Sequence, residues 1–293
     1  MGKSLVYIFI ATMAFATLEP VSKLIANEVS PFFMTCIRFI IGGLILIPFS
    51  IAKLRRLSIK LGFTDFLKLG LLGVLCVCIS MPLLQYGVLK SQSPALIAII
   101  VSSSSVFTVI FAAVFLREKI TGRKISAILL CLCGILVCFD WKSGTNIVSV
   151  LLAFSAAITF SFYTVMSKKL AAKIPGIIQN GFSFLTGSAV LLLALIVSGV
   201  QFTFEVNLKD VMVLSHLGIG VTGIGYWAYF KAMENSSAMA ASLVLFMKPV
   251  LTPFLSFFIT GTPFTVQTFA ALALVLAGSL LAMSTNVKTE QTC

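Results

Sequence analysis

Long apolar stretches separated by short polar loops recur along the whole sequence. Each stretch holds about 20 residues, which is enough for an α-helix to cross a hydrocarbon core of about 30 Å. No loop is long enough to form a separate extramembrane domain. The pattern predicts an all-α integral membrane protein with ten transmembrane helices, near residues 5–26, 32–52, 66–87, 95–116, 121–139, 147–168, 177–199, 211–231, 238–260 and 264–284.

The two halves of the chain repeat the same pattern. Gly42 falls on Gly187, 145 residues later, and Gly134 falls on Gly278, 144 residues later. Because five helices is an odd number, the second half must enter the membrane from the opposite side. Inverted repeats of this kind are the usual framework for alternating access, with the substrate near the bilayer midplane. The predicted units are a first five-helix repeat at 1–140, an inverted five-helix repeat at 147–285 and a short cytoplasmic tail at 286–293.

Composition and charge agree with a membrane protein. Of the 293 residues, 59% are hydrophobic and 10% are charged, whereas soluble domains contain roughly a quarter charged residues. The net charge of +12 lies in the loops, and no basic stripe interleaved with aromatic residues accompanies it. We therefore expect no nucleic-acid partner.

The loop charges also predict the orientation, because cytoplasmic loops are enriched in Lys and Arg. With the N-terminus inside, the outer loops hold Lys23, Lys90, Lys142 and Lys209. The inner side holds fourteen: Lys3, Lys53, Arg55, Arg56, Lys60, Arg117, Lys119, Arg123, Lys124, Lys168, Lys169, Lys173, Lys231 and Lys288. We expect a multi-pass protein of the cell membrane with both termini in the cytoplasm.

The cysteines indicate neither a disulfide framework nor a metal site. Six of the seven lie inside apolar stretches, and the pairs Cys76/Cys78 and Cys131/Cys133 are two residues apart on helices. Side chains at this spacing point to different sides of a helix, which is poor geometry for a shared metal. We expect packing roles for them, and no metal or other cofactor.

Several motifs, in their order and spacing, resemble those of a known family. They are Arg38-Phe39, Leu116-Arg117-Glu118-Lys119, the glycine-rich segment 218–226 and Lys248-Pro249-Val250. Over nearly its whole length the chain resembles the ten-helix branch of the drug/metabolite transporter superfamily, with two EamA-type repeats. It departs from the family pattern at Ser105, which stands where the second half has Pro249, and at Thr262, which matches Glu118.

The resemblance implies a carrier of small metabolites, such as amino acids, nucleobase-like compounds, organic cations or drugs. Such carriers are usually coupled to a proton or a counter-substrate. The identity of the substrate, the direction of transport, the coupling ion and the oligomeric state all stay open.

Three charged residues are predicted inside the hydrocarbon, where a charge costs at least about 2–3 kcal/mol. They are Glu19, Arg38 and Lys248, and a rise of about 1.5 Å per residue places them within a slab of about 6 Å. Glu19 precedes Pro20, and a proline in mid-helix bends the helix and frees a carbonyl. Two roles for Glu19 stay open, cation or proton binding and a structural ion pair. For Arg38 we favour a structural role, with its long side chain reaching the outer interface or an adjacent carbonyl.

Polar and aromatic side chains at a similar depth complete the candidate site. Tyr226, Tyr229 and Phe230 share a helix face through their i, i+3 and i, i+4 spacing. Such a stripe is either packing or a cage for an organic cation. The predicted substrate-binding residues are Glu19, Lys248, Ser104, Ser105, Thr159, Tyr163, Tyr226 and Trp227.

The predicted function is secondary active transport of a small polar or cationic metabolite by alternating access. An enzyme is disfavoured because the chain has one His, and because Asp65, Asp140 and Asp210 all lie at stretch ends. A membrane channel or a non-transporting scaffold is the alternative, although no filter-like loop or charged ring favours a channel. The expected partners are the lipid bilayer, a small-molecule substrate and a coupling proton or counter-substrate.

Overall fold

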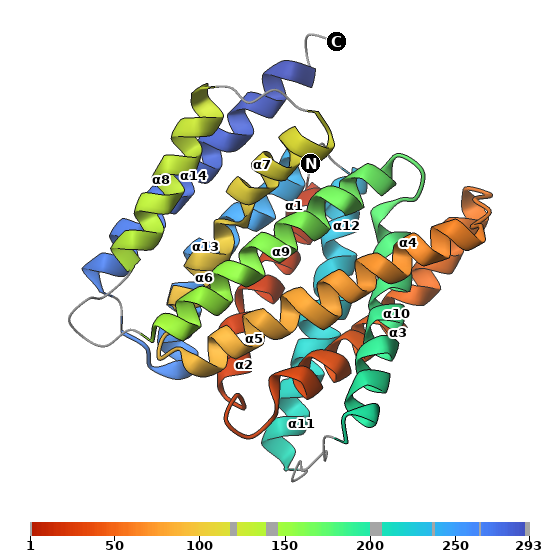
Figure 1. Cartoon of the computed structure of the whole chain (residues 1–293), viewed down its shortest axis with the longest axis horizontal. Helices are drawn as coiled ribbons and strands as arrows, with labels where there is room; N and C mark the ends of the chain where they lie inside the picture. Colours follow the sequence, from red (N-terminus) through yellow and green to blue (C-terminus); the bar gives the residue numbers. More distant parts are fainter. Residues whose placement is uncertain are drawn as a thin grey trace.

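The computed structural model describes residues 2–117, 122–138, 146–199, 207–235, 238–263 and 265–290. All regular structure in these residues is helical (Figure 1). Seven helical runs are long and apolar enough to cross a membrane: Leu5–Lys23, Pro31–Arg56, Phe63–Lys90, Pro94–Phe115, Ile147–Ala171, Gly176–Val197 and Leu208–Ala232. Shorter apolar helices follow at Met247–Thr260 and Val266–Gly278. The all-α, multi-pass architecture is thus confirmed.

The elements follow the predicted stretches closely. In chain order they are α1 (Gly2–Ala16), α2 (Leu18–Lys23), α3 (Pro31–Arg56), α4 (Phe63–Gly73), η1 (Val74–Ser80), α5 (Met81–Lys90), α6 (Pro94–Ser102), α7 (Ser104–Phe115), α8 (Gly122–Cys138), α9 (Ile147–Ala171), α10 (Gly176–Val197), α11 (Leu208–Ser215), η2 (His216–Gly225), α12 (Tyr226–Asn235), α13 (Ala238–Thr260) and α14 (Val266–Glu290). The last helix extends past its predicted end at residue 284, so most of the predicted tail is helical. The final residues, 291–293, lie outside the described ones.

The first predicted helix is interrupted between α1 and α2. Pro20 has no N–H to donate to the carbonyl of Ala16, where α1 ends. The Thr17 hydroxyl, at the interruption, lies 2.9 Å from Nε2 of His216 at the start of η2. The bend that the sequence predicted around Glu19-Pro20 is therefore present, and it places the Glu19 carboxylate among neighbouring helices.

Two segments, η1 and η2, form π-helices, which the sequence did not predict. Pro82 is the second residue of α5, two positions after the end of η1, and a wider turn relieves the clash between a proline ring and the carbonyl four residues earlier. In η2 the Thr222 hydroxyl donates to the Leu217 carbonyl, five residues back, at 2.9 Å. An offset of 144 moves Val74–Ser80 onto 218–224, inside η2. The same irregular turn therefore occurs at the same place in both halves.

Helices α3 and α10 pack against each other on the side of the bundle away from α8 and α14 (Figure 1). Phe39 and Phe184 meet there edge to face with ring centroids 4.7 Å apart, and both are fully buried. Helix α10 also packs closely against the end of α4, where a Cβ on Gly187 would lie 2.5 Å from the carbonyl oxygen of Gly73. Only glycine allows these two backbones to come so close. Helices α8 and α14 lie side by side at one edge of the bundle (Figure 1).

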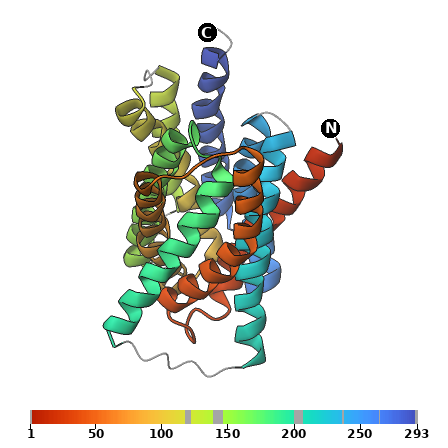
Figure 2. The same cartoon turned by 90° about the vertical axis from the view of Figure 1, so that its right-hand side faces the viewer.

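The start of α1 and the end of α14 lie toward the same end of the bundle (Figure 2). The opposite end carries the connection between α2 and α3 and the start of α11. There Glu28 accepts a hydrogen bond from Lys209 at 2.8 Å. This bond, and then the hydrogen bond from Asp210, hold the pKa of the Glu28 carboxyl below its usual value.

Candidate functional site

A buried ion pair joins the two halves of the chain. Lys248 of α13 donates from Nζ to Oε1 of Glu19, on α2, at 2.6 Å. The Glu19 side chain is completely buried and the Lys248 side chain is 15% exposed. Two of the predicted site residues, separated by 229 positions in the sequence, therefore meet directly. The second carboxylate oxygen, Oε2, is buried without a hydrogen-bond partner among the described residues.

This pair differs from the other ion pairs in the part of the chain that the structure describes. Lys173 contacts Asp65 at 2.7 Å and Lys209 contacts Glu28 at 2.8 Å, but these lysines are 59% and 50% exposed. Both pairs lie near helix ends, where water screens their attraction. Among these three pairs, only Glu19 and Lys248 have both side chains largely shielded from solvent, which makes their contact costly to break.

The structure corrects the interpretation of Arg38. Its side chain is 1% exposed and reaches neither the outer interface nor a carbonyl. It donates from Nε to the Thr222 hydroxyl at 2.9 Å and from Nη2 to the Met81 sulfur at 3.5 Å. Nη1 is buried and unpaired, and no ion pair joins Arg38 to any carboxylate that the structure describes. A helix count could not predict its inward direction, which depends on how α3 packs against η2.

Aromatic residues surround this guanidinium. Its central carbon lies 4.7 Å from the centroid of the Phe39 ring. The Tyr226 ring packs edge to face between Phe15 and Phe184, each 5.0 Å away between centroids. The rings fill their space by contacting each other, so in this conformation the aromatic stripe serves as packing.

The remaining predicted site residues are less closely associated with the ion pair. The Tyr163 hydroxyl is buried and donates to Oδ1 of Asn180 at 2.7 Å. The Thr159 hydroxyl donates to the Ser155 carbonyl of its own helix at 2.8 Å.

The two serines and the tryptophan complete the set. Ser104 contributes its carbonyl to a bond from Ser161 at 2.7 Å, and the side chain of Ser105 lies outside the described part. Trp227 packs against Tyr7, 5.5 Å between centroids, and its Nε1 is buried without a described partner. For these residues, substrate binding stays a prediction.

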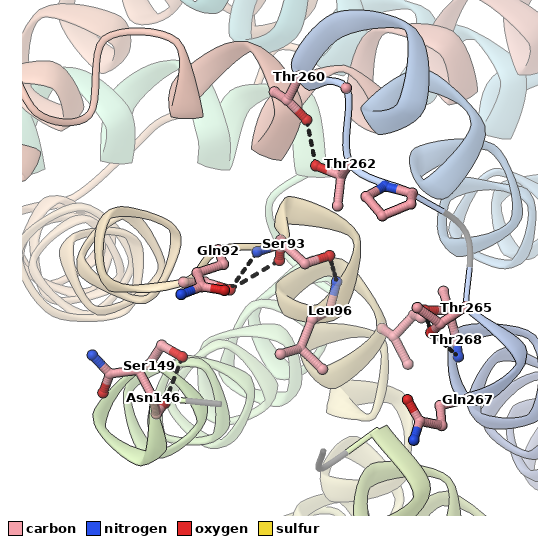
Figure 3. Close-up of a pocket in the computed structure, with 14 residues that line it drawn as sticks. Gln92, Ser93, Leu96, Asn146, Ser149, Thr260, Thr262, Thr265, Gln267 and Thr268 are labelled. Carbon is pink, nitrogen blue, oxygen red and sulfur yellow. Dashed lines mark hydrogen bonds between the residues drawn. The ribbon is translucent and has the colours of Figure 1, made fainter. Parts of the chain in front are cut away.

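A polar pocket opens where three connections meet at one end of the bundle (Figure 3). Its volume is about 470 Å³ and it is lined from segments 91–99, 146–149 and 260–268. Hydroxyl and amide side chains dominate the lining, and several are paired, such as Thr260 with Thr262 at 2.7 Å and Thr265 with Thr268 at 2.8 Å. No sequence pattern predicted this pocket, because its walls come from segments that are far apart in the chain.

The three charged residues that the sequence placed in the hydrocarbon are two cations, Arg38 and Lys248, and one anion, Glu19. Glu19 pairs with Lys248, and Arg38 has no ion pair with a carboxylate that the structure describes, which leaves one positive charge uncompensated among these three. No cluster of His, Cys, Asp and Glu that could hold a metal occurs in the described residues. The arrangement can therefore bind a polar group by replacing an ion-pair partner, and it can offer a guanidinium donor to an anionic group.

Comparisons with known proteins give the same overall picture. The model of the EamA-like transporter family matches the chain twice, over residues 2–139 and 147–284. An uncharacterized transporter of Clostridium kluyveri is 31% identical over 99% of this chain and 96% of its own length. One of Archaeoglobus fulgidus is 27% identical over 85% of this chain and 87% of its own. The uncharacterized inner membrane transporter YedA of Escherichia coli is 21% identical over 86% of this chain and 81% of its own length.

A solved crystal structure is also similar. It covers 99% of this chain and 99% of its own, with a TM-score of 0.68 and 22% sequence identity. Similarity at this level shows a shared fold and carries no information about the substrate.

Proposed function

This chain belongs to the EamA-like transporter family, and we propose that it is a secondary active transporter moving a small polar or cationic metabolite by alternating access. Membership makes it a membrane transporter. The proposal adds the mechanism, the class of substrate and the residues that act. The Glu19–Lys248 ion pair is the observation that carries it.

The ion pair connects an element of the first repeat to one of the second. Alternating access needs contacts between the repeats that form in one state and separate in another. Two buried charges are costly to separate unless another charged or polar group replaces the lost partner. A substrate that supplies such a group lowers the barrier between the states, so that movement and occupancy are coupled. A proton that neutralises Glu19 would have the same effect.

The excess positive charge narrows the class of substrate. Lys248 pairs with Glu19, whereas the buried Arg38 has no carboxylate partner among the described residues, and an unpaired buried charge is unfavourable. A metabolite that carries an anionic group next to its cationic one would compensate both ends of this cluster. Within the proposed range, the charges favour a zwitterionic or polar compound over a simple organic cation.

We also propose ten membrane spans arranged as two inverted repeats. The contacts between helices are the same when each helix is replaced by its counterpart in the other half. The contact of α5 with α9 corresponds to that of α12 with α1, and the pairs α3–α10 and α8–α14 each join a helix to its own counterpart. Loops near residues 92, 146 and 262 also meet at one pocket, which requires an even number of crossings between them. Both observations support the arrangement.

The proposed orientation places both termini in the cytoplasm. The excess of Lys and Arg in the inner loops supports it, as does the position of α1 and α14 at one end of the bundle (Figure 2). Cys293 should then react with an impermeant thiol reagent only after the membrane is opened. Labelling of this residue in intact cells would show that the termini face outward and would contradict the proposed orientation.

A counterflow assay tests the function. Proteoliposomes loaded with an unlabelled candidate metabolite should accumulate the radiolabelled form transiently, with saturable rates, because a carrier exchanges one bound molecule for another. A thermal-shift screen of amino acids, nucleosides, quaternary amines and aromatic drugs selects the candidate, since a ligand that binds the folded state raises its stability. Flux that fails to saturate would favour the channel alternative, and absence of flux with every ligand that raises stability would favour a scaffold.

A further inference from the structure

A row of hydroxyl side chains runs along α13 from the buried ion pair to the polar pocket. Its members after Lys248 are Thr252, Ser256 and Thr260, each four residues apart. Positions with this spacing are neighbours on a helix surface. Twelve residues span about 18 Å, which is a large part of the thickness of the hydrocarbon core. Lys248 lies at one end of the row, against Glu19, and Thr260 lines the pocket at the other.

The hydroxyl of Ser256, in the middle of the row, has no hydrogen-bond partner among the described residues. Thr252 and Thr260 donate to the carbonyls of Lys248 and Ser256, at 2.9 and 2.7 Å. Ser256 is fully buried, and its Oγ is unpaired among the described residues. Buried polar groups in native proteins are nearly always satisfied by protein, water or ligand. The unpaired hydroxyl therefore indicates a position that water or a solute reaches.

The equivalent helix of the first half does not carry the same row of hydroxyls. At the offset of 144, Thr252 falls on Thr108, but Ser256 falls on Ala112 and Thr260 on Leu116. The first half thus becomes apolar where the second half stays polar. Hydroxyls placed on only one of two equivalent helices point to a use on that side of the membrane.

The pocket fits a small solute without net charge. Its volume of about 470 Å³ is in the range of metabolite sites, about 300–1,000 Å³. No charged side chain is among the residues described as lining it, and the amides of Gln92 and Gln267 lie on two of its walls (Figure 3). Hydroxyl and amide groups bind neutral or zwitterionic polar compounds through hydrogen bonds and give little attraction to a highly charged one.

We propose that this pocket is the outer vestibule of the transport route, that it receives a small net-neutral polar solute, and that the α13 hydroxyl row connects it to the Glu19–Lys248 pair. The proposal rests on the proposed transport function and specifies its route. Solute entering from outside first exchanges water for the hydroxyls and amides of the vestibule. It then passes Ser256 and reaches the ion pair, whose partners separate to receive it.

Cysteine accessibility tests the route. The variants Thr260→Cys and Ser256→Cys are labelled in intact cells with a small impermeant methanethiosulfonate reagent, and Phe258→Cys is the matched control. Phe258 is 79% exposed on the surface of the same helix, where the proposed lipid contact excludes the reagent. We expect Thr260→Cys to react fastest, and Ser256→Cys at least about tenfold faster than Phe258→Cys, because the reactive thiolate forms in water and not in lipid. The unsubstituted chain reports any background from native cysteines.

Three results would overturn the route: no labelling at position 260, labelling at 260 without labelling at 256, or equal labelling at 256 and 258. A second comparison tests the solute class. A neutral hydrophilic thiol reagent should reach Thr260→Cys at least as fast as its cationic and anionic relatives, after correction for their rates with a free thiol. A clear preference for either charged reagent would overturn a vestibule for net-neutral solutes.

The experiment separates this inference from the transport function. Labelling depends only on access of water and reagent, so it does not need a transported substrate. Normal counterflow with an unlabelled Ser256→Cys would reject the route and leave the carrier intact. A labelled row in a protein that shows no counterflow with any stabilising ligand would reject the carrier function and, with it, the use of the row for transport.

Discussion

Glu19→Gln and Lys248→Met are each expected to lower transport at least about tenfold and to cost about 3–5 kcal/mol of stability, the usual effect of leaving a buried charge unpaired. The double variant is expected to be less damaged than the sum of the two, because it removes both charges together. Thermal or denaturant unfolding in detergent measures the stability, and counterflow measures transport in the same preparations.

The exposed pair at the bundle end provides the matched control. Glu28→Gln and Lys209→Met remove an ion pair of similar length, 2.8 Å against 2.6 Å, but both of its side chains are about half exposed. We expect changes of about 0–1 kcal/mol there and normal transport. If Glu19 is instead the proton site, Glu19→Gln should lose coupled transport while exchange and folding persist. Wild-type transport and stability in Glu19→Gln would exclude both roles.

Arg38→Met is expected to separate stability from function. Methionine has a similar length and no charge, and the Thr222 hydroxyl keeps its bond to the Leu217 carbonyl. Replacing an uncompensated buried charge by an apolar group is often neutral or stabilising, by about 1–4 kcal/mol. Transport should nevertheless fall at least about tenfold, because the donor for the anionic group of the substrate is lost.

Arg38→Lys is the control for charge. It keeps the positive charge but lacks the planar fork of the guanidinium, so we expect weaker substrate binding with a higher half-saturation concentration, and a smaller loss of transport. A strongly destabilised Arg38→Met whose folded fraction transports normally would contradict the proposed role. It would show that the guanidinium has a structural function in joining α3 to η2.

The sequence was most informative where one-dimensional patterns suffice. Apolar stretches predicted the helices, and the depth of Glu19 and Lys248 predicted that they could meet, because a charge in hydrocarbon requires a partner. The direction of Arg38 could not be predicted in this way. It depends on the rotation of α3 against η2, and a π-helical turn changes which residues face a neighbouring helix.

The pocket and the pairing of its hydroxyls were beyond sequence reasoning for a different reason. Its walls are loops that are close only after the helices have packed, and loops of Ser, Thr, Gln and Asn look the same in sequence whether they face water or each other. Thr260, Thr262 and Gln267 carry no charge and no motif. Only their common position around the connection from α13 to α14 makes them notable.

The matching π-helical turns record something of the history of the chain. A π turn contains one residue more than the α turn it replaces, so it is the structural trace of an insertion. The family model matches each half separately, and both halves carry the trace at the same place. Two independent insertions at equivalent positions are a less economical explanation than one. A single π turn that was present before a half-length unit was duplicated accounts for both.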